Sequence, residues 1–114
     1  MANPDTHSIL QDLDRLIAER RSADPEASYV AGLLRDGPAR ISRKLGEEAV
    51  ESVIAGLQES DEALVGEIAD LWFHSLVLLA TRGLSSEQVL AVLADRFGLS
   101  GLEEKRRRQE PGSA

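Results

Sequence analysis

The segment from Leu71 to Ala80 is apolar at nearly every position, so a helix through it is apolar on almost all sides. Such a helix has to be covered by neighbours from several directions. The residues just before it include Glu67 and Asp70, and charged groups within a helix argue against a membrane span. We therefore expect a central helix of a soluble, cytoplasmic protein that has no secretory leader and no membrane association.

Helical periodicity extends through the rest of the chain. Apolar residues recur three and four positions apart, and no segment alternates apolar and polar residues as a strand would. Helices are expected at about 8–21, 28–35, 39–58, 61–82 and 85–97. Capping boxes are expected at Ser8 with Gln11 and at Ser85 with Gln88. The third helix carries an apolar stripe made of Ile41, Leu45, Ala49, Val53 and Leu57. The prediction is an all-α fold of four to five helices, in which a short loop makes the third and fourth antiparallel neighbours.

The length of 114 residues indicates one domain, expected at 8–105 between a flexible N-terminus (1–7) and a basic, disordered tail (106–114). No cysteine is present, which excludes disulfides and thiolate metal sites. The net charge of −7 argues against nucleic-acid binding, which usually needs a basic surface. An excess of carboxylates is typical either of a divalent-cation site or of a well-solvated surface.

Two pairs of carboxylates have the spacing of a metal site. Glu48 and Glu51 lie one helical turn apart, and Glu67 and Asp70 repeat that spacing on the next helix. Carboxylate oxygens that meet between two helices suit Mg²⁺ or Mn²⁺. An acidic helix face is more often only solvated. However, Glu67 and Asp70 lie in the most apolar helix, which has no Lys or Arg before Arg82, so a bound cation explains them best.

The residue set disfavours iron and zinc. Di-iron bundles use Glu-x-x-His pairs on two helices, whereas His74 is the only histidine expected in the core. A histidine on a buried helix is most often a hydrogen-bonded core residue, and a hydrogen bond from His74 to a substrate stays open as the alternative. No Gly-rich phosphate loop is present, so metals and side chains would have to hold any phosphate groups.

The chain contains Glu47-Glu48-x-x-Glu51 and, after fifteen residues, Glu67-x-x-Asp70, a pattern that resembles the signature of the all-α, MazG-like nucleoside triphosphate pyrophosphatase superfamily. Within that superfamily, residues 9 to 105 are similar to the phosphoribosyl-ATP pyrophosphatase family. The segments that carry this closer similarity are 28–34, 44–51, 67–74, 78–85 and 100–105. Trp72-Phe73 departs from the family's pattern, in which a smaller aliphatic residue and a Tyr are expected.

The resemblance implies hydrolysis of 1-(5-phosphoribosyl)-ATP to 1-(5-phosphoribosyl)-AMP and pyrophosphate, the second step of histidine biosynthesis. Water attacks with the help of Mg²⁺, which Mn²⁺ could replace. The implied metal ligands are Glu48, Glu51, Glu67 and Asp70. The implied catalytic residues are Glu47, Glu48 and Glu51, of which Glu47 supports the metal or positions water. The implied substrate contacts are Ser28, Tyr29, Lys44, His74 and Lys105. The family forms homodimers, and a helical bundle completed by dimerisation would bury Trp72 partly or wholly.

Simpler interpretations stand beside these assignments. Ser28 could act only as a helix N-cap, Tyr29 could act only in packing, and the run Lys105 to Arg108 is more often a solubilising end. Two other functions also stay open: a general pyrophosphatase that removes dUTP or non-standard NTPs, and a non-enzymatic helical interaction module. The segments around Ser28 and Lys105 argue against the first. The second predicts no Mg²⁺-dependent thermal shift.

Overall fold

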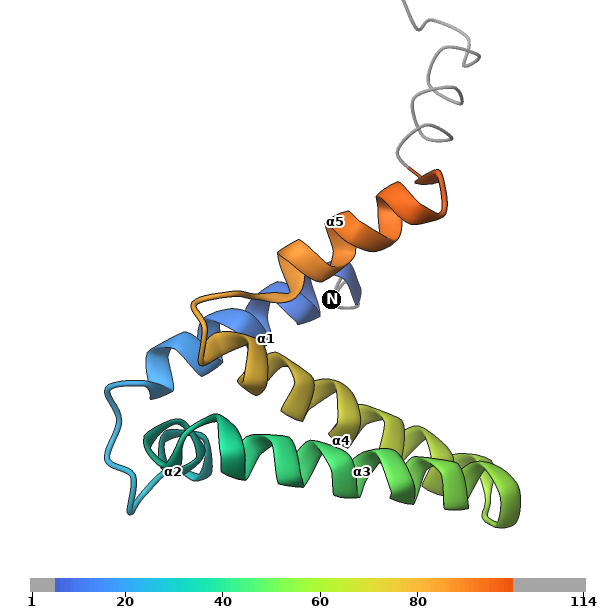
Figure 1. Ribbon diagram of the computed structural model, residues 1–114, viewed down its shortest axis with the longest axis horizontal. Helices are drawn as coiled ribbons and strands as arrows, with labels where there is room; N and C mark the ends of the chain where they lie inside the picture. Colours follow the sequence, from blue (N-terminus) through green and yellow to red (C-terminus); the bar gives the residue numbers. More distant parts are fainter. Residues whose placement is uncertain (1–5, 100–114) are drawn as a thin grey trace, which may run out of the picture.

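The computed structural model describes residues 6–99, with side chains from residue 9 onward (Figure 1). These residues form five helices and no strand: α1 (Thr6–Arg20), α2 (Tyr29–Asp36), α3 (Pro38–Gln58), α4 (Asp61–Ala80) and α5 (Ser86–Arg96). The predicted all-α class is confirmed, and each predicted helix end lies within two residues of the observed one. The predicted basic tail (106–114) and Lys105 lie outside the described residues, as does most of the predicted flexible N-terminus.

Serine caps and one glycine define the start of three helices. The Ser28 hydroxyl accepts a hydrogen bond from the backbone N–H of Ala31 (3.2 Å) and thereby caps α2. The predicted capping box of Ser85 and Gln88 is present at α5. Gly37 separates α2 from α3 with a φ of 90°, a conformation that glycine adopts without a Cβ clash. These ends are local features, and the sequence pattern predicts them correctly.

Two predicted helix ends differ by two residues from the observed ones. The capping box proposed at Ser8 is not at a helix start, because α1 already begins at Thr6. The fourth helix does not reach Arg82, because it ends at Ala80 and the chain then turns through Gly83, whose φ is 71°. The turn allows α5 to leave α4 in a new direction (Figure 1).

A long antiparallel hairpin of α3 and α4 forms one side of the molecule, as the short loop between them predicts (Figure 1). Near the start of α3 and the end of α4 the hairpin is held by α2, and α1 packs against α4. α5 runs beside α1 rather than along the hairpin (Figure 1). The hairpin therefore has one end that is held among other helices, while its tip, at residues 59–60, projects alone.

The hydrophobic core lies at the held end of the hairpin. Six buried side chains from α1, α2, α3 and α4 form it: Ile17, Val30, Leu33, Ile41, Leu76 and Val77. Burial of side chains of this size contributes about 1.5–3 kcal/mol each. Because four helices contribute to this one cluster, it determines how the beginning of α3 lies against the end of α4.

The apolar stripe predicted on α3 is fully buried only at its beginning. Ile41 is fully buried, whereas Val53 and Leu57 are 61% and 78% exposed in the single chain. The buried side of α3 beyond Ile41 carries instead Glu48 and Ser52. The helix therefore presents polar and small residues to α4 and leaves a row of apolar side chains uncovered.

α4 is long and apolar enough to cross a membrane when only length and composition are considered, and 17% of its most apolar window is buried in the single chain. Core helices of soluble proteins meet the same criterion. Glu67 and Asp70 lie in the middle of this helix, where a bilayer would make their charges costly. These carboxylates favour protein neighbours rather than lipid as the cover of α4.

The Asp14 carboxylate of α1 is hydrogen-bonded to the first residue of α5. Asp14 accepts hydrogen bonds from the backbone N–H of Ser86 (3.1 Å) and from its hydroxyl (2.5 Å), and Ser86 is 4% exposed. Asp14→Ala leaves both donors unsatisfied and should lower the free energy of unfolding by about 1–3 kcal/mol. Urea unfolding measures this loss. The matched control is Asp12→Ala, which removes only an exposed ion pair with Arg15 and should change stability by less than about 0.5 kcal/mol. Equal effects of the two substitutions would contradict the assignment.

Candidate active site

Three carboxylates meet between α3 and α4. Glu48 comes from the middle of α3, Glu67 and Asp70 come from α4, and one oxygen of each lies within 4.8 Å of the other two. The spacing of three residues places the α4 pair on one face of the helix, and the antiparallel hairpin brings Glu48 opposite that face. Carboxylate oxygens that converge in this way are the ligands that hard divalent cations such as Mg²⁺ prefer. The structure therefore brings together three of the four predicted metal ligands.

The carboxylate of Glu48 is the most buried of the three, with 4% of the residue exposed. Its Oε1 lies 3.4 Å from the ammonium of Lys44 and 4.0 Å from Nδ1 of His74. Its Oε2 and the Oε2 of Glu67 are buried and have no hydrogen-bond partner among the residues that the structure describes. Buried carboxylate oxygens without a donor are costly. A cation between Glu48 and Glu67 would bind both oxygens, so the donor set fits a divalent ion.

Glu51, the fourth predicted ligand, lies beside Glu67 and changes its acidity. The pKa of Glu67 is raised from 4.5 to about 7, first by a hydrogen-bonded contact with Glu51 and then by burial. The negative charges of Glu51, Glu48 and Asp70 raise this pKa further. Like charges at short range disfavour the ionisation of Glu67. A divalent cation would offset this repulsion.

The burial of the acids differs from the sequence-based expectation. That expectation places unpaired, costly carboxylates on α4, but Asp70 is exposed and Glu67 is only half-buried in the single chain. The buried carboxylate is Glu48 on α3. The reason is that α4, although apolar, is covered mainly by α3 and α1, and this cover leaves Asp70 exposed.

Lys44 lies close to the carboxylate cluster, whereas Glu47 does not join it. The Lys44 side chain is 40% exposed, and its hydrogen bond to Glu48, with the charge of that carboxylate, raises the pKa of Lys44 above its usual value. Glu47 is exposed and is not one of the three converging acids. Ser28 is an N-cap, and Lys105 lies outside the described residues. The structure thus places a cation next to the acids, where a phosphate group could reach it.

Tyr29 and His74 are joined by a contact that spacing in the sequence does not reveal. The Tyr29 hydroxyl lies 3.0 Å from Nε2 of His74, and Nδ1 of the ring lies 2.8 Å from the carbonyl oxygen of Asp70. His74 is 5% exposed, so in the free protein it is a hydrogen-bonded core residue. The two residues expected to depart from the family pattern directly precede His74: Phe73 packs edge-on against the His74 ring, and Trp72 is 60% exposed in the single chain.

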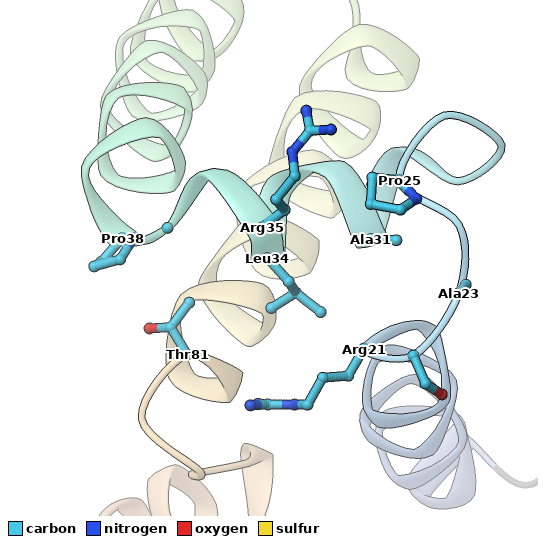
Figure 2. A pocket seen from close by; sticks show the side chains of 10 residues that line it. Arg21, Ala23, Pro25, Ala31, Leu34, Arg35, Pro38 and Thr81 are labelled. Carbon is cyan, nitrogen blue, oxygen red and sulfur yellow. The ribbon is translucent and has the colours of Figure 1, made fainter.

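A recess of about 490 Å³ lies away from the carboxylates, between α2, the α1–α2 loop and the end of α4 (Figure 2). Its lining includes two arginines and none of the clustered acids. Arg21 donates a hydrogen bond to the carbonyl oxygen of Ala80, and Arg35 pairs with Asp36 and Glu26. Figure 2 shows the Arg21 side chain extending across the recess toward Thr81. Because both arginines already have partners, the recess offers weak attraction to an anion, and the carboxylate cluster is the better candidate site.

Comparison with known proteins shows the family to which the chain is similar. The profile of the family described as phosphoribosyl-ATP pyrophosphohydrolase matches residues 10–97. A phosphoribosyl-ATP pyrophosphatase of Erythrobacter litoralis is 60% identical over 101 residues, which cover 89% of this chain and 97% of the relative. One of Novosphingobium aromaticivorans is 53% identical, covering 85% of this chain and 91% of the relative. A phosphoribosyl-ATP pyrophosphatase of Hydrogenovibrio crunogenus is 45% identical, covering 92% of this chain and 96% of the relative. The matched residues include all of the described carboxylate cluster.

The raised pKa of Glu67 predicts a pH-dependent stability of the metal-free protein. Between pH 4.5 and about 7 the folded chain keeps a proton on this group that the unfolded chain releases. Stability should therefore fall as the pH rises through this window and level off above it. Urea unfolding at pH 5, 6, 7 and 8 in the presence of a chelator, compared with Glu67→Gln, isolates this effect. Equal pH slopes for the two proteins would contradict the assignment.

Proposed function

The chain belongs to the phosphoribosyl-ATP pyrophosphohydrolase family, and we propose on this basis that it hydrolyses 1-(5-phosphoribosyl)-ATP to 1-(5-phosphoribosyl)-AMP and pyrophosphate, the second step of histidine biosynthesis. The observation that carries the proposal is the convergence of Glu48, Glu67 and Asp70 between two helices. Hydrolysis of a phosphate anhydride develops negative charge on the leaving pyrophosphate, and a site for this reaction has to balance that charge. The reaction takes place in the cytoplasm.

The cation of this enzyme is Mg²⁺, which Mn²⁺ can replace. Its ligands are Glu48, Glu51, Glu67 and Asp70, a choice supported by the 4.8 Å cluster, the unpartnered oxygens and the raised pKa of Glu67 beside Glu51. Carboxylate oxygens are the ligands that these hard cations prefer. When bound, the ion shields phosphate charge and stabilises the leaving pyrophosphate.

The chain's own residues bind the substrate and orient water. The Lys44 ammonium, half-exposed beside Glu48, binds a phosphate oxygen. The Ser28 hydroxyl accepts the N–H of Ala31 as an N-cap and keeps its own proton to donate to the substrate. Glu47 and Glu51 accept hydrogen bonds from the attacking water, and Lys105 provides a further positive charge for the substrate.

A second copy of the chain completes the helical bundle. Val50, Val53, Ile54 and Leu57 of α3 lie on the side opposite Glu48, and these four residues are 44–78% exposed. The radius of gyration is 17.6 Å, whereas a compact domain of about 100 residues has about 13 Å. Exposed apolar area of this kind is typical of subunit interfaces. A symmetric dimer would cover the stripe on α3 and the Trp72 side of α4.

Substrate preference tests the proposed reaction. Pyrophosphate release should proceed with a kcat/KM at least roughly 100-fold higher for phosphoribosyl-ATP than for dUTP or the common NTPs, because part of the binding energy comes from groups that simple nucleotides lack. A coupled pyrophosphate assay over this panel measures the ratio. Equal or better turnover of dUTP would indicate a general nucleotide pyrophosphatase instead.

Replacement of a carboxylate tests the metal site. Asp70→Asn should reduce Mg²⁺-dependent turnover by roughly 100-fold or more, because a neutral amide binds a hard cation weakly. Metal-free stability should not fall, since a like charge is removed from the cluster. The matched control is Asp61→Asn at the exposed start of α4, which should keep full turnover. Near-normal activity of Asp70→Asn would remove this residue from the site.

Sedimentation at low micromolar concentration tests the assembly. The measured mass should be about twice the chain mass of 12.4 kDa. Leu57→Glu places a charge within the apolar stripe and should raise the dimer dissociation constant by about tenfold or more. Gln58→Glu adds the same charge to the next residue, which is exposed and outside the stripe, and should leave the dimer intact. A fully active monomer at this concentration would contradict the dimer and leave the metal site unaffected.

A further inference from the structure

The hydrogen bond between Tyr29 and His74 has a direction that its surroundings determine. Nδ1 of His74 lies 2.8 Å from the backbone carbonyl oxygen of Asp70. A carbonyl oxygen only accepts hydrogen bonds, so the proton of the neutral imidazole is on Nδ1. Nε2 is then an acceptor, and the Tyr29 hydroxyl, 3.0 Å away, donates a hydrogen bond to it.

The ring of His74 is held in this orientation. The residue is 5% exposed, and the rings of Tyr29 and Phe73 lie nearly perpendicular to it, with centroids 5.9 Å and 5.4 Å away. Turning the ring over would place a carbon atom instead of Nδ1 opposite the Asp70 carbonyl and lose that bond. The donor and acceptor positions of the ring are therefore fixed by its packing.

The Tyr29 oxygen is consequently left with acceptor capacity only. Tyr29 is 50% exposed, and within the described part of the chain its hydroxyl has no hydrogen-bond partner other than His74. Nδ1 of the His74 ring that this hydroxyl contacts lies 4.0 Å from Oε1 of Glu48, and the same oxygen lies 3.4 Å from the Lys44 ammonium. A half-exposed tyrosine whose oxygen is an acceptor therefore borders the carboxylate cluster and Lys44.

We propose that Tyr29 binds the nucleoside part of the substrate, its oxygen accepting a hydrogen bond from a ribose hydroxyl or a base N–H, and that His74 is the positioning residue that holds it in this state. Phosphate oxygens are themselves acceptors, so they cannot bond to an oxygen that offers only lone pairs. Phosphate groups are left to Lys44 and to the cation. The inference rests on the proposed function, because it requires a substrate in which a nucleoside adjoins a polyphosphate.

Measuring the binding of each product separately tests whether Tyr29 binds the nucleoside part and Lys44 binds the phosphate groups. Calorimetric titration of the full chain in Mg²⁺ buffer uses phosphoribosyl-AMP, which carries the nucleoside donors, and Mg²⁺–pyrophosphate, whose oxygens are acceptors. Tyr29→Phe keeps the ring that packs on His74 and should weaken phosphoribosyl-AMP binding by about 3- to 10-fold, with pyrophosphate binding unchanged within about twofold. Lys44→Met is the matched control and should show the opposite pattern, with the larger loss for pyrophosphate.

His74 is tested through its effect on Tyr29. His74→Gln should weaken phosphoribosyl-AMP binding, and Tyr29→Phe should cost little more in that background, because the two residues act as one unit. Additive losses would overturn the positioning role. If His74→Gln does not fold, the Tyr29→Phe titrations alone decide the proposal. Equal weakening of both products by Tyr29→Phe would show donation to phosphate, and no change in either would show no contact; both results overturn the inference.

Turnover of phosphoribosyl-ATP by the unsubstituted protein keeps the two proposals distinguishable. A protein that hydrolyses this substrate but fails the titration pattern overturns only the role of Tyr29. A protein that neither hydrolyses phosphoribosyl-ATP nor binds phosphoribosyl-AMP overturns the proposed function and the inference together.

Discussion

The contact between α3 and α4 is the constraint on which the rest of the molecule depends. The two helices meet through a face of α3 that carries Glu48 and Ser52, while the later part of its apolar stripe points away. Core side chains hold the contact at one end only, where Ile41 and Val77 belong to the same buried cluster. Glu48 follows Ile41 by about two helical turns on the same side of α3. The core therefore determines the register that places the Glu48 carboxylate opposite the acids of α4.

This packing places the carboxylates of Glu48 and Glu67 close together between the two helices, where their negative charges are unfavourable in the metal-free protein. Glu48 is buried, Glu67 has a pKa raised to about 7, and one oxygen of each lacks a donor within the described residues. Lys44 offsets part of this charge from 3.4 Å. Binding of a divalent cation removes these unfavourable interactions together, because the ion supplies the positive charge and the missing ligand contacts at once. The carboxylates in the most apolar helix are therefore understandable as part of a binding site, although they weaken the metal-free fold.

The short helix α2 matters because it brings a hydrogen-bonding hydroxyl group, that of Tyr29, near the carboxylate cluster. Tyr29 in its first turn contacts His74, and His74 is bonded to the carbonyl of Asp70. Asp70 thus contributes its side chain to the acids and its backbone to the orientation of the ring. The acids and Lys44 suit a cation and phosphate groups, whereas an oriented hydroxyl suits hydrogen-bond donors. A site with both features can bind the two chemically different parts of a nucleotide at once.

Local patterns in the sequence determined the helices, the Ser85–Gln88 cap and the carboxylate pairs, because each depends on residues three or four positions apart. Periodicity shows which residues share a helix face, but it does not show which face meets which neighbour. Only the tertiary structure decided that Glu48 is buried against α4 while Leu57 stays exposed, since the core at the far end of the hairpin sets the rotation of α3. The contact of Tyr29 with His74, 45 residues apart in the chain, depends in the same way on how α2 meets α4 around that core.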